Sequence, residues 1–137
     1  MSLGSLRLSN LTLIAVVDDD EAVREALCDL LQVEGLGARG FAGAVAFLDD
    51  YAPKRFDLVI TDIRMPQVDG FEFLRRLRTV EVAPPVIVLT SLSDDATRAH
   101  AVAEGARACL TKPVTDAALL ELVGSILGRH VTASPEG

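Results

Sequence analysis

Short runs of consecutive hydrophobic residues alternate along this chain with longer stretches in which hydrophobic residues recur every three or four positions. A continuous run such as Leu13–Val17 is typical of a strand that is buried on both faces of a sheet. The stretch from Val23 to Leu31 has instead the spacing of an amphipathic helix, and Gly35 stands where that helix can end. The alternation of these two patterns predicts repeated units of one strand and one helix.

The hydrophobic runs predict five strands, and the periodic stretches predict five helices. The strands are expected at Leu13–Val17, Ala38–Phe41, Leu58–Thr61, Val86–Leu89 and Ala108–Thr111. The helices are expected from Val23 to Gly35, at Ala44–Asp50, at Phe71–Arg78, between Ser93 and Gly105, and along a last stretch that contains Leu119–Leu127. Ser93 is expected to cap the fourth helix. This alternation predicts an α/β fold with a parallel sheet that helices cover on both faces.

The size and composition of the chain suit a single globular domain. It has 137 residues, of which 50% are hydrophobic and 24% are charged. We expect the domain to cover residues 11–128, after an N-terminal extension at residues 1–10 and before a polar tail at residues 129–137. Residues 1–3 are candidates for vector-encoded residues.

Charge and hydropathy exclude several classes of function. A formal net charge of -7 makes the chain a poor candidate for binding nucleic acid, which requires clustered Lys and Arg. No hydrophobic run approaches the roughly 20 residues that span a bilayer, and no secretory signal is visible, so we expect a cytoplasmic protein without membrane contacts. Cys28 and Cys109 lack the spacing of a zinc site and are expected to be small buried residues.

Polar residues stand where four of the predicted strands end. The acidic run Asp18–Glu21 follows the first strand, Asp62 the third, Thr90 and Ser91 the fourth, and Lys112 the fifth. In an open parallel sheet, ligands bind outside the carboxyl ends of the strands. These four ends can therefore bring carboxylates, a hydroxyl group and an ammonium group into one cleft.

This set of groups is suited to phosphoryl chemistry. Carboxylates that lie close together repel one another unless a cation intervenes, and Mg²⁺ prefers carboxylate and carbonyl oxygens. A bound magnesium ion can orient a phosphoryl group whose remaining oxygens contact Thr90 and Lys112. Asp62 has no acidic neighbour and precedes a turn-rich segment, so it is the favoured nucleophile for an acyl phosphate. Asp18 and Asp19 are better suited to the metal.

Four motifs follow one another in a fixed order. They are Val16–Asp20 (VVDDD), Thr61–Gly70 (TDIRMPQVDG), Leu89–Ser91 (LTS) and Leu110–Pro113 (LTKP). Together they resemble the receiver domain of two-component response regulators, and the resemblance covers roughly Leu13–Leu127. It implies a flavodoxin-like (CheY-like), doubly wound fold with five helices, in which five parallel strands take the order 2-1-3-4-5.

The resemblance also implies a role for each acidic residue in a phosphorelay. Asp62 would be the phosphoacceptor, and Asp19, Asp62 and the backbone carbonyl of Arg64 would bind Mg²⁺. Asp18 would act through a metal-bound water. Arg64 and Leu92 occupy positions that tune the lifetime of the phosphoryl group in the family. Such a domain catalyses only its own phosphorylation and dephosphorylation, so it is not expected to be an enzyme in the usual sense.

The resemblance extends to the residues that would respond to phosphorylation. Thr90 and Lys112 would bind the phosphoryl oxygens, and the Lys112–Pro113 peptide bond would be cis. Receivers commonly carry Tyr or Phe three residues before the lysine, where the ring moves inward as the Thr or Ser shifts, but this chain has Cys109 there. We therefore expect phosphorylation to move residues 91–95 without a large side-chain swing at Cys109.

The phosphodonor is expected on another protein, because His100 and His130 both lie outside the predicted cleft. The resemblance implies a sensor histidine kinase or a histidine phosphotransfer protein, docked around Val23–Leu30 and Pro113–Asp116. It also implies that the fourth helix, the fifth strand and the last helix form a face that controls an output partner or effector domain. A homodimer through this face is a further expectation.

Three alternative functions are weighed against this interpretation. Asp18 and Asp20 have the spacing of the paired aspartates of haloacid-dehalogenase-like phosphatases, which place the nucleophile on the first strand. A flavin-binding flavodoxin is set aside, because it would need a phosphate-binding loop rich in Ser, Thr and Gly where Asp18–Glu21 would repel the phosphate. The third alternative is a pure interaction module that is never phosphorylated. The complete set of Asp18, Asp19, Asp62, Thr90 and Lys112 argues against it, but Cys109 keeps it open.

Overall fold

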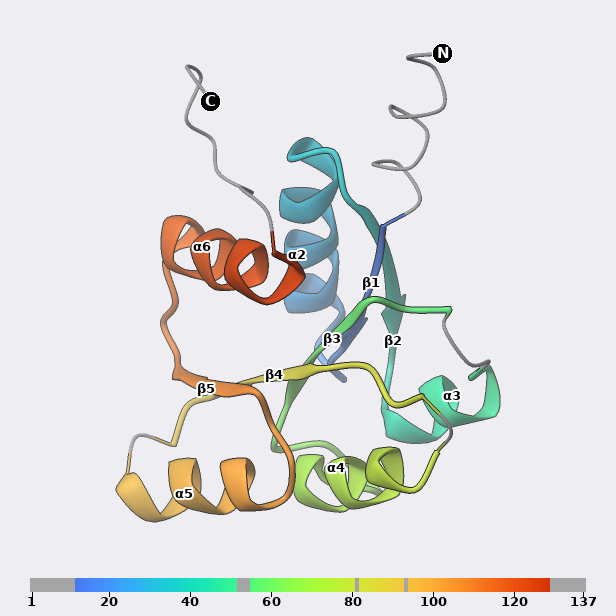
Figure 1. Cartoon of the computed structure of the whole chain (residues 1–137), viewed down its shortest axis with the longest axis vertical. Coiled ribbons are helices and arrows are strands. Elements are labelled where there is room, and N and C mark those ends of the chain that lie inside the picture. Colours follow the sequence, from blue (N-terminus) through green and yellow to red (C-terminus); the bar gives the residue numbers. More distant parts are fainter. Residues whose placement is uncertain (1–11, 52–54, 81, 93, 129–137) are drawn as a thin grey trace.

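The computed structural model describes residues 12–51, 55–80, 82–92 and 94–128. Five parallel strands form one twisted sheet in the order β2-β1-β3-β4-β5 (Figure 1). The strands are β1 (Leu13–Val17), β2 (Gly37–Phe41), β3 (Leu58–Asp62), β4 (Val86–Thr90) and β5 (Ala108–Thr111). The expected 2-1-3-4-5 order and the flavodoxin-like fold are therefore confirmed.

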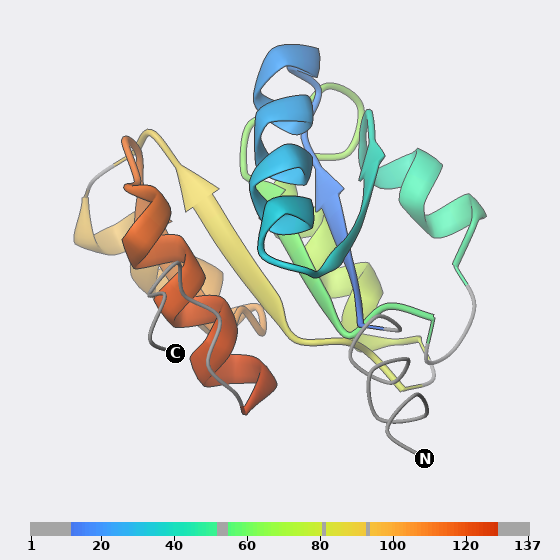
Figure 2. The same cartoon turned by 90° about the horizontal axis from the view of Figure 1, so that it is seen from above.

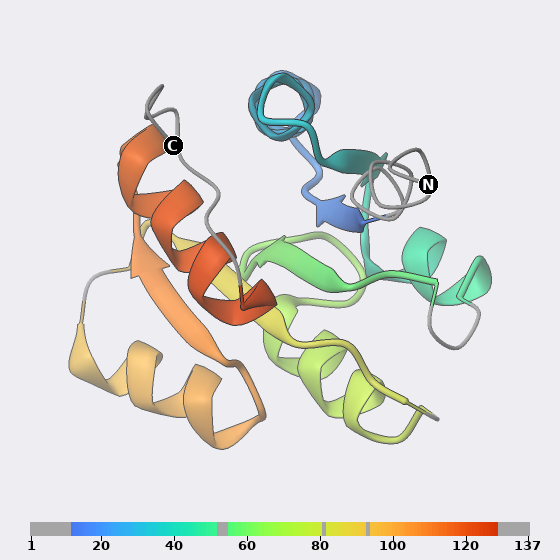
Figure 3. The same ribbon diagram turned by 45° about the horizontal axis from the view of Figure 1, so that its top comes forward.

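Helices cover both faces of this sheet. They are α2 (Glu21–Val33), α3 (Ala44–Asp49), α4 (Gly70–Arg78), α5 (Asp95–Ala103) and α6 (Asp116–Leu127). Helices α2 and α6 lie on one face of the sheet, and α3, α4 and α5 lie on the other, as Figures 1, 2 and 3 show from three directions. The fold is doubly wound, with each parallel strand followed by a helix that crosses back over the sheet.

The core consists of two layers because successive side chains of a strand point to opposite faces. In β1, Ile14 and Val16 pack into the layer under α2 and α6, whereas Ala15 and Val17 pack into the layer under α3, α4 and α5. Strands β3 and β4 lie inside the sheet and are hydrophobic on both sides, which explains the continuous hydrophobic runs in the sequence.

The start of α5 differs from the prediction. The N-cap is Asp94, whose side chain accepts a hydrogen bond from the amide of Thr97 at 2.6 Å. Ser93 lies outside the described residues. The carboxylate is a stronger acceptor than a hydroxyl group at the positive end of a helix, so an aspartate can take the capping position from a neighbouring serine.

Two further expectations have definite outcomes. Cys28 and Cys109 are only partly buried, which corrects the expectation of buried cysteines. Cys28 packs at the margin of the core on α2, and Cys109 lies on the edge strand β5. The Lys112–Pro113 peptide bond is cis, as expected.

Among the described residues, no helix has the length and hydrophobicity needed to cross a bilayer.

Candidate functional site

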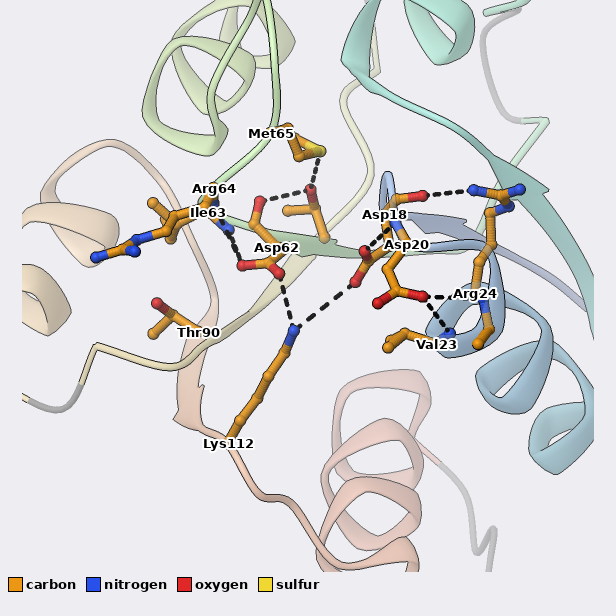
Figure 4. A network of polar contacts seen from close by, with 12 residues as sticks. Asp18, Asp20, Val23, Arg24, Asp62, Ile63, Arg64, Met65, Thr90 and Lys112 are labelled. Carbon is orange, nitrogen blue, oxygen red and sulfur yellow. Dashed lines mark hydrogen bonds and ion pairs between the residues drawn. The ribbon is translucent and has the colours of Figure 1, made fainter.

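The carboxyl ends of β1, β3, β4 and β5 meet at one edge of the sheet. Asp18 directly follows β1, Asp62 ends β3, Thr90 ends β4, and Lys112 directly follows β5 (Figure 4). Because all the strands are parallel, their carboxyl ends share this edge, and β1 and β3 are direct neighbours in the sheet. The fold thus brings together the polar residues that the sequence places at four separate strand ends.

Lys112 joins the two carboxylates of this site. Its Nζ donates a hydrogen bond to Oδ2 of Asp62 at 2.8 Å and lies 3.8 Å from Oδ2 of Asp18. Burial alone would lower the pKa of Lys112, but the hydrogen bond to Asp62 and the charges of Asp62 and Asp18 raise it above its ordinary value. Lys112 is therefore a fixed positive charge between the ends of β1 and β3.

The carboxylate of Asp62 is held on both oxygens. Oδ1 accepts hydrogen bonds from the amides of Ile63 at 2.6 Å and Arg64 at 3.3 Å, while Oδ2 accepts from Lys112. The side chain keeps 14% of its surface exposed. Asp62 is thus oriented by the backbone that follows it and remains accessible to a reactant.

The acidic run after β1 divides into residues with different surroundings. Asp18 is buried, and its Oδ1 accepts a hydrogen bond from the amide of Asp20 at 2.9 Å. Burial is the main reason that the pKa of Asp18 lies above its ordinary value, and the charges of Asp62 and Asp19 add to the effect. Asp20 caps α2 by accepting from the amides of Ala22 and Val23. Asp19 is exposed.

An open cleft of about 560 Å³ lies beside these residues. Its lining consists of Asp19, Ile63, Arg64, Met65, Pro66, Asp69 and Leu92. Two residues expected to bind Mg²⁺, Asp19 and Arg64, therefore border the same cleft. Leu92 lies in the loop between β4 and α5, whereas Ile63, Arg64, Met65, Pro66 and Asp69 lie in the loop between β3 and α4.

The donor atoms of this site fit a magnesium ion. Within the described ranges, no group of three or more Asp, Glu, His or Cys side chains is close enough to hold a metal alone. Mg²⁺ does not need such a group, because it retains several waters and usually takes only one or two carboxylates. Asp19, Asp62 and the carbonyl of Arg64 offer only hard oxygen donors. A cation there would also offset the repulsion between Asp18 and its acidic neighbours.

Thr90 is buried and is joined to the loop that follows it. Its Oγ1 accepts a hydrogen bond from the amide of Leu92 at 3.1 Å, and its carbonyl accepts from the amide of Lys112 at 2.7 Å. Cys109 pairs with Val88 in the sheet and packs against the core layer of α3, α4 and α5. Burial raises the pKa of the Cys109 thiol.

The sequence predictions missed Arg24 and a contact of Arg98. Nη1 of Arg24 donates to the backbone carbonyl of Asp18 at 2.7 Å, and Nη2 of Arg98 donates to Oγ1 of Thr111 at 3.0 Å. Arg24 follows the acidic run within the first turn of α2, which was the only available signal. A contact to a backbone carbonyl leaves no trace in a pattern of residue types.

Comparisons with known proteins give one consistent result. A family model of the response regulator receiver domain matches residues 14–124. The transcriptional regulatory protein FixJ of Azorhizobium caulinodans is 40% identical over 116 residues, which cover 85% of this chain and 55% of FixJ. The chain spans about half the length of this FixJ protein and of the other FixJ proteins that it matches.

Solved structures agree with the family model. The BeF3-activated DrrB receiver domain has a TM-score of 0.78 at 32% identity, over 87% of this chain and 99% of that chain. A response regulator receiver protein from Pseudomonas putida has a TM-score of 0.76 at 36% identity, over 83% of this chain and 96% of that chain. Fold, motif order and site geometry lead to the same assignment: the chain belongs to the receiver domain family of two-component response regulators.

Proposed function

We propose that this receiver domain, residues 11–128, is switched by Mg²⁺-dependent phosphorylation of Asp62. The carrying observation is the position of the Asp62 carboxylate, which lies between two backbone amides and the ammonium group of Lys112. Donors on both oxygens orient the carboxylate, and the positive charge lies where phosphoryl oxygens would arrive. Phosphoryl transfer requires mainly this kind of positioning and charge neutralisation.

In the proposed reaction, a carboxylate oxygen of Asp62 attacks the phosphorus of a phosphohistidine on the donor protein. The P–N bond breaks, its electron pair returns to the imidazole nitrogen, which takes up a proton, and an acyl phosphate forms on Asp62. Bound Mg²⁺ would supply charge neutralisation for the phosphoryl oxygens, with Asp19, Asp62 and the carbonyl of Arg64 as its ligands and Asp18 acting through water. Lys112 binds another phosphoryl oxygen.

Thr90 is the proposed link between the phosphoryl group and the surface. Its hydroxyl oxygen accepts from the amide of Leu92, so the O–H remains available as a donor to a phosphoryl oxygen. Movement of Thr90 toward that oxygen would pull on residues 91–95. This response requires no rotation of Cys109, whose side chain packs against the core.

A sensor histidine kinase or a histidine phosphotransfer protein is the proposed donor. His100 lies on α5, stacked on Phe71 with 3.8 Å between ring centroids and close to Glu104, which suits a surface role. His130 lies outside the described residues. We propose donor docking on α2 and on the loop between β5 and α6. The face formed by α5, β5 and α6 would control an output partner or effector domain and could pair with a second copy.

Intact-protein mass after incubation with acetyl phosphate tests this proposal. We expect a single phosphoryl adduct on the wild-type protein with Mg²⁺, and none with EDTA or in Asp62→Asn. Asp49→Asn is a matched control, because Asp49 is an exposed carboxylate at the end of α3. It should keep the full adduct.

Two results would contradict the proposed site. One is an adduct of equal yield in Asp62→Asn. The other is repeated hydrolysis of a small phosphate ester that Asp18→Asn abolishes and Asp62→Asn leaves intact, as a phosphatase with its nucleophile after β1 would show. Absence of any adduct would leave two interpretations: the pure interaction module, or a domain that accepts a phosphoryl group only from its own kinase.

A further inference from the structure

We propose that Arg24 is a positioning residue of the acidic site, and that Gly40 provides the space in which its side chain lies. Arg24 would act through the backbone of Asp18, which it holds in the orientation that the site requires. The effect on metal affinity rests on the proposed Mg²⁺-dependent function. The effect on backbone order does not.

Both backbone polar groups of Asp18 are paired. Its N–H donates to the carbonyl of Phe41 on β2 at 3.1 Å. Its carbonyl accepts from Arg24 on α2 at 2.7 Å (Figure 4). The side chain is held as well, since Oδ1 accepts from the amide of Asp20 at 2.9 Å. Asp18 is therefore fixed between a strand and a helix, and its Oδ2 lies 3.8 Å from Nζ of Lys112.

Arg24 supplies a donor where the sheet no longer does. Strand β1 ends at Val17, so the carbonyl of Asp18 lies beyond the paired part of the strand. A guanidinium group is always charged and presents several N–H donors. Its hydrogen bond to the partly buried carbonyl of Asp18 is therefore charge-assisted, and such bonds are stronger than those between neutral groups. Arg24 therefore closes the turn that carries Asp18, Asp19 and Asp20.

Gly40 makes room for this contact. A Cβ at Gly40 would lie 2.8 Å from Cγ and 2.9 Å from Cδ of Arg24, both closer than a real contact allows. Gly40 pairs with Val16 in the sheet and does not have a positive φ, so its backbone could accept other residues. The requirement is for space, because the stem of Arg24 lies against β2 at this point.

The charge of Arg24 and its hydrogen bond predict opposite effects on metal affinity. A positive charge close to an acidic site weakens cation binding, so removal of the charge alone would strengthen the binding of Mg²⁺. Loss of a residue that orients metal-binding groups weakens binding, by roughly tenfold or more in comparable sites. The sign of the change therefore separates positioning from a simple charge effect.

The test compares Arg24→Met, Gly40→Ala and the double variant with the wild-type full chain. Arg76→Met is a matched control, because Arg76 is an exposed cation on α4 that pairs with Glu72. Two quantities are measured: the Kd for Mg²⁺ by titration calorimetry, and hydrogen exchange of the Asp20 amide without metal. Circular dichroism establishes that each variant is folded, and Gly40→Ala retains the charge of Arg24.

We expect the Kd for Mg²⁺ to rise roughly tenfold in Arg24→Met and severalfold in Gly40→Ala, with the double variant no weaker than Arg24→Met. Exchange of the Asp20 amide should accelerate roughly tenfold, while the amides of α4 remain protected. Unchanged or tighter Mg²⁺ binding in Arg24→Met, together with unchanged Asp20 exchange, would overturn the inference. A wild-type protein that binds no Mg²⁺ would instead contradict the proposed function, and the exchange measurement would still decide the role of Arg24.

Discussion

Asp18 shows how a single residue can serve a site at the expense of stability. It is a buried carboxylate with Asp19 and Asp62 close enough to raise its pKa further, and Lys112 offsets only part of that effect. Burial of charge is unfavourable unless it is compensated, and functional sites commonly retain such groups despite the cost. The pH dependence of stability should report this cost directly.

The first prediction concerns Asp18→Asn in metal-free buffer. Because the pKa of Asp18 is raised in the folded state, the folded protein binds this proton more tightly than the unfolded chain does. Ionised Asp18 therefore lowers the free energy of unfolding at pH values above its pKa in the folded state. This cost disappears as the pH falls toward the pKa of an aspartate in the unfolded chain, about 3.9. We expect Asp18→Asn to raise the free energy of unfolding by about 1 kcal/mol at pH 7.

Urea unfolding at pH 7 and at pH 4 checks this expectation. The gain in the free energy of unfolding of Asp18→Asn should be larger at pH 7 than at pH 4. The slope of this free energy against urea concentration should be the same in both proteins. A variant that is less stable than the wild-type protein at pH 7 would show that the contacts of Asp18 with Asp20 and Lys112 outweigh the cost of its burial.

The second prediction concerns Cys109. We expect beryllofluoride and Mg²⁺, which imitate a bound phosphoryl group, to shift the amide resonances of residues 91–95. The Leu92 amide should shift most because it donates to the hydroxyl group of Thr90. The Cys109 side chain should keep its rotamer, since it packs against the core layer under α5. A crystal structure in which Cys109 exchanges an outward rotamer for a buried one would contradict this mechanism.

Among the elements, the start of α4 is the one most tightly fitted to the site. The amide of Gly70 donates to the carbonyl of Ile63 at 2.7 Å, which closes the loop after β3, and Asp69 caps the helix. A Cβ at Gly70 would lie 2.6 Å from the carbonyl oxygen of Asp62 and 2.7 Å from Cα of Ile63. The backbone of α4 therefore touches the backbone that orients the Asp62 carboxylate.

The third prediction follows from this close packing. We expect Gly70→Ala to lower the free energy of unfolding by about 2 kcal/mol, because the added methyl group meets backbone rather than a flexible side chain. It should also slow phosphorylation of Asp62 by acetyl phosphate. Denaturant unfolding and the rate of adduct formation measure the two effects.

Gly43→Ala is the matched control for this substitution, because a Cβ at Gly43 meets nothing within 4 Å. It should cost much less stability and leave the phosphorylation rate unchanged. Equal losses in the two variants would show that the effect reflects helix starts in general rather than the contact with Asp62.

Element by element, the sequence predicted the secondary structure well where one physical signal dominated. Strands β3 and β4 are hydrophobic on both faces, so their continuous runs identified them. The prediction that Ser93 caps α5 was wrong, because Ser and Asp are both good capping residues. Only the fold determines which of the two faces the free amides of the helix, and in the structure it is Asp94. Full burial of Cys109 was wrong because every residue of the edge strand β5 is only partly buried, although the strand is a hydrophobic run.

Considered as a whole, the molecule gathers the site by topology. Four strand ends that are far apart in sequence meet because every strand is parallel, so the residue types at those ends predicted which side chains would be neighbours. The contact of Arg24 with the Asp18 carbonyl and the contact of Thr90 with the Leu92 amide were not predictable in this way. Each involves a backbone group, and every residue carries the same backbone groups.

The most direct test of the central claim is chemical trapping of the phosphorylated residue. Borohydride reduces an acyl phosphate to an alcohol, which converts the modified aspartate into homoserine. After incubation of the wild-type protein with acetyl phosphate and Mg²⁺, peptide mass spectrometry should find homoserine at position 62 and at no other acidic position. Homoserine at position 18 or 19, with Asp62 intact, would contradict the account.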